Sequence, residues 1–151
     1  MLKVGIIGGG SWGTTVGSLV ARNAHVTLWA RDENTVNDIN THHQNKKYLD
    51  GFPLNKNLKA SHSLQETLED ADVIVMAVPS QNYRSVLEKM KPFIRPWIPI
   101  VSLTKGLEQG TCLRMTEIVE EMLPEHPVGV LTGPNLAKEI LQGQAAAAVI
   151  A

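Results

Sequence analysis

Residues 2–13 read LKVGIIGGGSWG, a short apolar run that leads directly into a cluster of glycines. Gly8, Gly10 and Gly13 fit the spacing G-x-G-x-x-G. In this pattern the first glycine permits a tight turn, the second lets a pyrophosphate approach the backbone, and the third lets a helix lie close to the strand. The free N–H groups at the start of that helix bind phosphate oxygens. Because the glycines follow a strand and open a helix, the stretch predicts a dinucleotide-binding turn rather than a glycine-rich turn without a ligand.

The rest of the chain alternates strands with helices. Residues 73–78, VIVMAV, form the clearest strand, and the absence of polar alternation predicts burial on both faces of a parallel sheet. The predicted strands are 2–7, 26–30, 58–61, 73–78, 98–103, 128–131 and 145–150, the predicted helices are 12–23, 35–44, 63–71, 80–90, 113–123 and 135–141, and 45–57 is a predicted loop. We therefore expect one α/β domain over residues 1–151, a doubly wound, mostly parallel sheet of the Rossmann dinucleotide-binding type.

Two serines mark predicted helix starts. Ser63 is followed three residues later by Glu66, which is the spacing of a capping box. Ser80 follows Pro79 and is predicted to cap the next helix.

Composition excludes several classes of protein. The 14 Lys and Arg residues nearly balance 15 Asp and Glu residues, so no basic patch predicts a nucleic-acid partner. A single cysteine, Cys112, excludes an intrachain disulfide, and no histidine pair has the context of a metal site. No apolar run approaches the roughly 20 residues of a membrane helix. We expect a soluble, cytoplasmic protein without resident metal or membrane insertion, and a homodimer is compatible with the sequence.

Arg31 stands at the end of the second predicted strand, where NAD enzymes often place an acid against the ribose 2′-hydroxyl. A guanidinium there can face a 2′-phosphate or stack on adenine, or it can simply be solvated. Asp32 follows and could still reach the ribose. This pattern favours NADP, or the use of both NAD and NADP.

Three other strand ends carry candidate site residues. Pro79 is predicted to shape the wall beside the nicotinamide, although a proline followed by a capping serine is also an ordinary helix start. Lys105 is the candidate catalytic residue, since a lysine at a central strand end can stabilise the negative charge that develops during hydride transfer. The alternative is a solvated lysine. The backbone around Gly133, together with Asn135, could hold an anionic or polyol substrate, or Asn135 could simply cap a helix.

These motifs together resemble the bacterial type of NAD(P)-dependent glycerol-3-phosphate dehydrogenase. They occur in family order and cover the whole chain: GGGSWGT at 8–14, LWAR at 28–31, YL-x-G at 48–51, AD-x-I at 71–74, AVPS at 77–80, TKGLE at 104–108 and GPNLAKE at 133–139.

The resemblance implies roles for individual residues. Ser11, Trp12, Arg31 and Ala137 would contact the nucleotide, and Lys105 would touch both cofactor and substrate. Gly133 and Asn135 would bind the glycerol phosphate, although many family members carry Ser or Thr at the position of Asn135. The implied reaction is the reversible reduction of dihydroxyacetone phosphate to sn-glycerol 3-phosphate by NADH or NADPH, which feeds phospholipid synthesis.

The chain departs from the family in length. Family members continue with an all-helical domain, absent from these 151 residues, which supplies a second lysine as proton donor and acceptor and the Arg and Asn that hold the substrate. We therefore expect the cofactor-binding half of an enzyme, inactive alone in the absence of that domain. Two other hypotheses are a stand-alone NAD(P)-binding module without turnover and a dehydrogenase of a related family that acts on a different carboxylate or phosphate.

Overall fold

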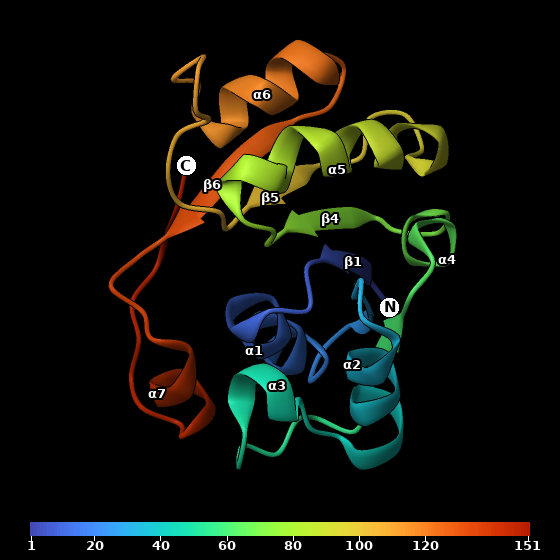
Figure 1. Cartoon of the computed structure of the whole chain (residues 1–151), viewed down its shortest axis with the longest axis vertical. Helices are drawn as coiled ribbons and strands as arrows, with labels where there is room; N and C mark the ends of the chain where they lie inside the picture. Colours follow the sequence, from blue (N-terminus) through green and yellow to red (C-terminus); the bar gives the residue numbers. More distant parts are fainter.

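A computed structural model describes all residues, 1–151, and contains one seven-stranded sheet (Figure 1). The strand order is β3-β2-β1-β4-β5-β6-β7. Neighbouring strands from β3 to β6 are parallel, whereas β7 runs antiparallel to β6. The bounds are β1 Lys3–Ile7, β2 His25–Trp29, β3 Leu58–Ser61, β4 Val73–Met76, β5 Ile100–Ser102, β6 Val128–Thr132 and β7 Val149–Ile150. The predicted doubly wound, mostly parallel sheet is confirmed.

Helices cover both faces of this sheet (Figure 1). Helices α5 and α6 lie on one face, and α1, α2 and α3 lie on the other. The bounds are α1 Ser11–Val20, α2 Glu33–Asn37, α3 Lys46–Leu49, α4 Leu64–Leu68, α5 Tyr83–Met90, α6 Met115–Met122 and α7 Ala137–Leu141, with short turns η1 Asp38–His42, η2 Ser80–Asn82 and η3 Lys91–Phe93. None of these helices has the length and apolarity needed to cross a membrane.

The apolar core is divided by the sheet into two layers. One layer joins Ile74 and Met76 of β4 to the apolar faces of α5 and α6, and the other joins Ile6 and Leu28 to the α1 side. Successive residues of a strand point to opposite faces, so β4 supplies side chains to both layers. This explains why its sequence shows no polar alternation.

The predicted loop 45–57 is wrong at its start, because α3 begins at Lys46 and Asn45 is fully buried. Several other elements are also shorter than predicted. The helix expected from Asn135 begins at Ala137, and the last strand covers only Val149–Ile150.

The serine predictions are only partly right. The Ser63 hydroxyl accepts a hydrogen bond from the Glu66 N–H at 3.2 Å, as a cap should. The Glu66 carboxylate accepts from the Ser61 hydroxyl at 2.6 Å instead of completing the capping box. Ser80 caps nothing with its side chain, because it opens the η2 turn in front of α5.

Tyr83 is the largest side chain with no exposed surface, and it carries a buried hydroxyl into the core. Burial raises its pKa to about 12, with a smaller opposing effect from the nearby Ser102 hydroxyl. Neither hydroxyl makes a hydrogen bond of normal geometry. Tyr83 therefore contributes through its ring, while its oxygen is desolvated without compensation.

We predict that Tyr83→Phe keeps or raises the free energy of unfolding, by up to about 1 kcal/mol, because it removes an unpaired buried polar atom. Tyr83→Ala, which also removes the ring, should lose roughly 3–5 kcal/mol. Urea unfolding monitored by circular dichroism measures both values. A loss of more than about 1 kcal/mol in Tyr83→Phe would contradict the prediction and indicate a hydrogen bond to Ser102.

Candidate functional site

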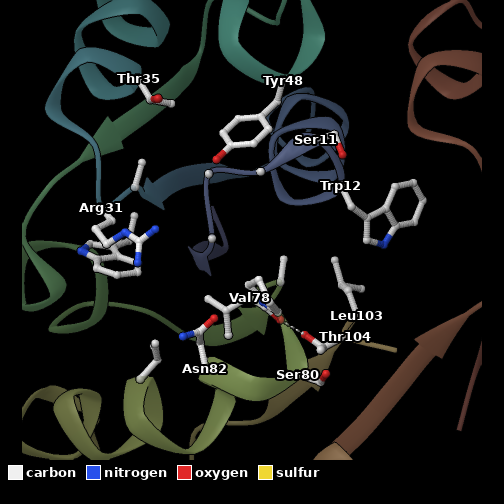
Figure 2. Close-up of a pocket in the computed structure, with 18 of the residues that line it drawn as sticks. Ser11, Trp12, Arg31, Thr35, Tyr48, Val78, Ser80, Asn82, Leu103 and Thr104 are labelled. Atoms are coloured by element: carbon white, nitrogen blue, oxygen red, sulfur yellow. Dashed lines mark hydrogen bonds between the residues drawn. The ribbon is translucent and has the colours of Figure 1, made fainter. Parts of the chain in front are cut away.

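A cavity of about 700 Å³ opens where the carboxyl ends of β1, β2, β4 and β5 meet (Figure 2). The chain leaves β1 toward one face of the sheet and β4 toward the other, so the cavity lies at the point where the strand order reverses. Ligands of doubly wound proteins bind at this position. The glycine turn and α1 form one wall, and the segments after β4 and β5 form the opposite wall (Figure 2).

The glycine turn leaves space for a ligand at one position only. Gly8 has φ +127°, and a Cβ there would lie 2.5 Å from the Ala77 carbonyl oxygen. A Cβ on Gly13 would overlap the Gly8 carbonyl oxygen. At Gly10, by contrast, a Cβ would meet nothing within 4 Å, and no side chain caps the N-terminus of α1 at this residue. The turn therefore presents backbone to open space, and this arrangement fits the pyrophosphate of a dinucleotide.

Two charged residues follow β2 on the cavity wall. Arg31 is exposed and makes no hydrogen bond or ion pair in the structure. Asp32 caps α2 by accepting from the Asn34 N–H at 3.0 Å, and it also pairs with the Lys47 ammonium at 3.2 Å. The Lys47 hydrogen bond and the Asn34 N–H lower the pKa of Asp32. Its carboxylate is thus engaged within the chain, and its reach to a ribose stays a prediction.

Lys47 and Tyr48 also line the cavity, and the sequence alone did not reveal them. Both belong to α3, which Asn45 fastens to the glycine turn. The Asn45 amide donates to the Gly9 carbonyl and to the Thr14 hydroxyl, both at 3.0 Å, while its oxygen accepts from the Tyr48 N–H at 3.4 Å. The signals in the sequence were the YL-x-G motif at 48–51 and an asparagine three residues before Tyr48, at the spacing of a helix cap.

Lys105 lies on the opposite wall, in the segment that follows β5. Its neighbour Thr104 donates from its hydroxyl to the Val78 carbonyl at 2.7 Å, as Figure 2 shows. The Gln81 side chain donates to the Leu107 carbonyl and accepts from the Gln109 N–H, both at 3.0 Å. These bonds attach the lysine segment to the start of α5.

An ion-pair network completes this attachment. Arg84 of α5 forms two parallel hydrogen bonds to Glu108, at 2.8 and 2.9 Å, and a third to Glu121 of α6 at 2.7 Å. Paired donors of this kind hold a carboxylate in one orientation as well as binding it. The Arg84 guanidinium, assisted by the Thr111 hydroxyl and opposed by burial, lowers the pKa of Glu108 to about 2.

Most of the predicted site residues line one cavity. Nine of them line the cavity: Gly8, Gly10, Ser11, Trp12, Arg31, Pro79, Lys105, Asn135 and Ala137. Gly13 does not, since it packs beneath the turn. Gly133 also does not line the cavity. A Cβ at Gly133 would overlap the Ala147 carbonyl oxygen, so packing against the segment before β7 requires a glycine at this position.

Asn135 does not cap α7, because the cap position is Leu136 and makes no side-chain bond. The Asn135 Oδ1 atom is buried and has no hydrogen-bond partner in the structure. To accept a hydrogen bond from a ligand in the cavity, this oxygen must first be exposed by rotation of the Asn135 side chain. No group of three or more His, Cys, Asp or Glu side chains could hold a metal ion in residues 1–151.

Comparison with known proteins agrees with this geometry. The family model described as "NAD-dependent glycerol-3-phosphate dehydrogenase N-terminus" matches residues 3–151. The chain belongs to this family. The hypothesis of a related dehydrogenase family is therefore wrong, and the family resemblance seen in the motifs is confirmed.

Relatives show how much of a family member the chain represents. It is 60% identical over 149 residues to a protein named glycerol-3-phosphate dehydrogenase [NAD(P)+] 2 from Sphingopyxis alaskensis, covering 99% of this chain and 45% of the relative. A crystal structure of glycerol-3-phosphate dehydrogenase from Coxiella burnetii matches 99% of this chain and 46% of its own, with 33% identity and a TM-score of 0.91. A solved structure of the Plasmodium falciparum glycerol-3-phosphate dehydrogenase matches 99% of this chain and 45% of its own, with 31% identity and a TM-score of 0.92. The chain thus spans a little under half the length of these relatives.

Glu108 gives a pH dependence with a definite sign. Its pKa in the folded chain, about 2, lies below its ordinary value of 4.5, so the ionised form stabilises the fold. This contribution is complete above 4.5 and is lost as the pH falls toward about 2. We predict that Glu108→Gln has a lower free energy of unfolding than wild type at neutral pH. The difference between the two free energies should narrow as the pH falls through this window.

Urea unfolding between roughly pH 6 and pH 2.5 measures the effect. Glu120→Gln on α6 is the matched control, because Glu120 is exposed and forms no salt bridge. Parallel stability curves for wild type and Glu108→Gln throughout the window would contradict the prediction.

Proposed function

We propose that the chain is the cofactor-binding half of an enzyme that reversibly reduces dihydroxyacetone phosphate to sn-glycerol 3-phosphate with NADH or NADPH. The observation that carries the proposal is the open space at Gly10, at an uncapped helix N-terminus, within a cavity at the switch point of the sheet. Family membership adds the reaction, since the relatives are named glycerol-3-phosphate dehydrogenase [NAD(P)+].

The nucleotide would be held by the glycine turn and its neighbours. Backbone N–H groups near Gly10 and Ser11 would bind the pyrophosphate, and Trp12 would cover it from the cavity wall. Arg31 would meet the adenosine end, and Pro79 and Ala137 would line the remaining length. Bound NADH or NADPH supplies the hydride.

Lys105 would act on the substrate. Lys105 is exposed, lines the cavity and makes no salt bridge. Its ammonium can therefore donate a hydrogen bond to a carbonyl oxygen or a phosphate oxygen. A cation at that oxygen stabilises the alkoxide that develops as a hydride reaches the carbonyl carbon. The unpartnered Asn135 Oδ1 would accept from a substrate hydroxyl, and Gly133 would contribute through its backbone.

The competing function is a stand-alone NAD(P)-binding module without turnover. Lys105, fastened to the cavity wall by α5, favours the enzyme, because nucleotide binding alone does not need a fixed cation on the substrate side. An intact mass of the natural protein, compared with its open reading frame, distinguishes a truncated enzyme from a natural short protein.

The setting of the protein is part of the proposal. A single cysteine and the absence of a membrane-crossing helix are consistent with the cytoplasm. Exposed apolar side chains at Leu136, Val149 and Ile150 offer surface for association, including a homodimer, which light scattering measures.

Two alanine substitutions test the phosphate site. We predict that Gly10→Ala leaves the unfolding free energy within about 1 kcal/mol of wild type, because its Cβ meets no atom and its φ of −76° suits alanine. It should weaken NADH and NADPH binding by about tenfold or more, at least ~1.4 kcal/mol. Gly13→Ala should instead destabilise the fold by roughly 1–3 kcal/mol through overlap with Gly8.

Calorimetric titration measures binding, and thermal unfolding measures stability. Unchanged nucleotide affinity in a folded Gly10→Ala chain would overturn the phosphate-site assignment.

The 151-residue chain should bind nucleotide but oxidise no measurable NADH or NADPH in the presence of dihydroxyacetone phosphate. The reason is that it spans under half of its named relatives and offers a single candidate catalytic group, Lys105. Absorbance of the reduced nucleotide follows the reaction, with a full-length relative as the positive control. Turnover by the chain alone would show that its own residues suffice.

A further inference from the structure

Three charged side chains meet at the cavity end beyond β2: Arg31, Asp32 and Lys47. They form a group with two cations and one acid, called the β2 charge cluster below. Figure 2 places Arg31 and Thr35 at this end of the cavity, whereas Trp12 lies at the other end. In doubly wound dinucleotide sites, this is the end at which the adenosine ribose is recognised.

The acid of the β2 charge cluster is already engaged by its own surroundings. Asp32 Oδ1 accepts from the Asn34 N–H at 3.0 Å, and Oδ2 accepts from the Thr35 hydroxyl at 3.3 Å and from Lys47 Nζ at 3.2 Å. An acid that selects NAD must accept hydrogen bonds from the ribose hydroxyls. Lys47 competes directly with that role.

The two cations have different environments. Arg31 has no acidic partner, so its guanidinium is free to bind a ligand anion. Lys47 is shared between Asp32 and the face of the Tyr48 ring, 5.5 Å from the ring centre. Its position is fixed through α3, because the buried Asn45 ties that helix to the glycine turn. The cluster therefore carries a net charge of +1 toward the cavity.

We propose that Lys47 is a specificity-determining residue for the 2′-phosphate of NADPH. It neutralises Asp32, which would otherwise repel that phosphate, and so leaves the Arg31 guanidinium as the uncompensated positive charge of the cluster. Arg31 alone would face an unpaired acid, and the two charges would cancel. This inference rests on the proposed function, since it concerns the same nucleotide site.

The test compares Lys47→Met with Lys46→Met, its matched control. Lys46 is the neighbouring exposed lysine, and its side chain does not line the cavity. Calorimetric titration of the folded chain with NADPH and with NADH gives the ratio of the two Kd values. Lys47→Met should weaken NADPH binding by about tenfold and leave NADH binding unchanged or slightly tighter, as expected for the loss of one charge-assisted contact.

Three further measurements sharpen the result. Lys47→Arg should keep the NADPH preference, because it keeps the charge. Asp32→Asn retains a good helix cap and removes the negative charge. In an Asp32→Asn background, Lys47→Met should therefore lower the NADPH affinity by less than it does in wild type. The affinity of wild type for NADPH should fall more steeply with salt than that of Lys47→Met.

An equal loss of NADPH and NADH affinity in Lys47→Met, or the same selective loss in Lys46→Met, would overturn the inference while leaving the nucleotide site intact. Equal affinity of wild type for the two nucleotides would also overturn the inference, while the proposed nucleotide site would stand. If the wild-type chain bound neither nucleotide, the proposed function would fail together with the inference.

Discussion

Close approach between the first turn and the neighbouring strand ends organises the whole domain. No side chain fits at Gly8 against Ala77, and a Cβ on Gly9 would lie 2.6 Å from the Ala30 side chain. The turn can therefore rest directly on the ends of β2 and β4, and α1 starts at the sheet surface with its N-terminus directed into the cavity. Each wall of the cavity depends on this contact: the β2 end carries Arg31, and the β4 end leads to Pro79.

Much of the fold could be predicted from the sequence because its signals are local. Apolar runs without polar alternation mark buried parallel strands, and a glycine pattern after the first strand defines the first turn. Prediction failed where distant contacts decide. Asn45 is a polar residue whose burial depends on atoms of Gly9 and Thr14, more than 30 positions away, and no periodicity reports such a contact. Glu66 is a different case: its partner Ser61 is only five positions away, but that hydroxyl comes within reach because β3 ends there.

The candidate site was predictable to the extent that strand ends converge. Arg31, Pro79 and Lys105 follow three parallel strands, so all three meet at one edge of the sheet. Lys47 and Tyr48 follow no strand and reach the cavity only through α3. Gly133 has a packing role that its motif did not reveal, because a Cβ there would overlap the Ala147 carbonyl oxygen. Its neighbour Asn135 lines the cavity and holds a buried amide oxygen without a partner, which no sequence pattern indicates.

The attachment of the Lys105 segment to α5 has a thermodynamic consequence. Gln81 and Arg84 hold that segment, and the same helix follows directly on the cavity wall at Pro79 and Ser80. Ligands that contact these two surfaces are therefore coupled through α5, and by linkage each must change the affinity for the other by the same factor.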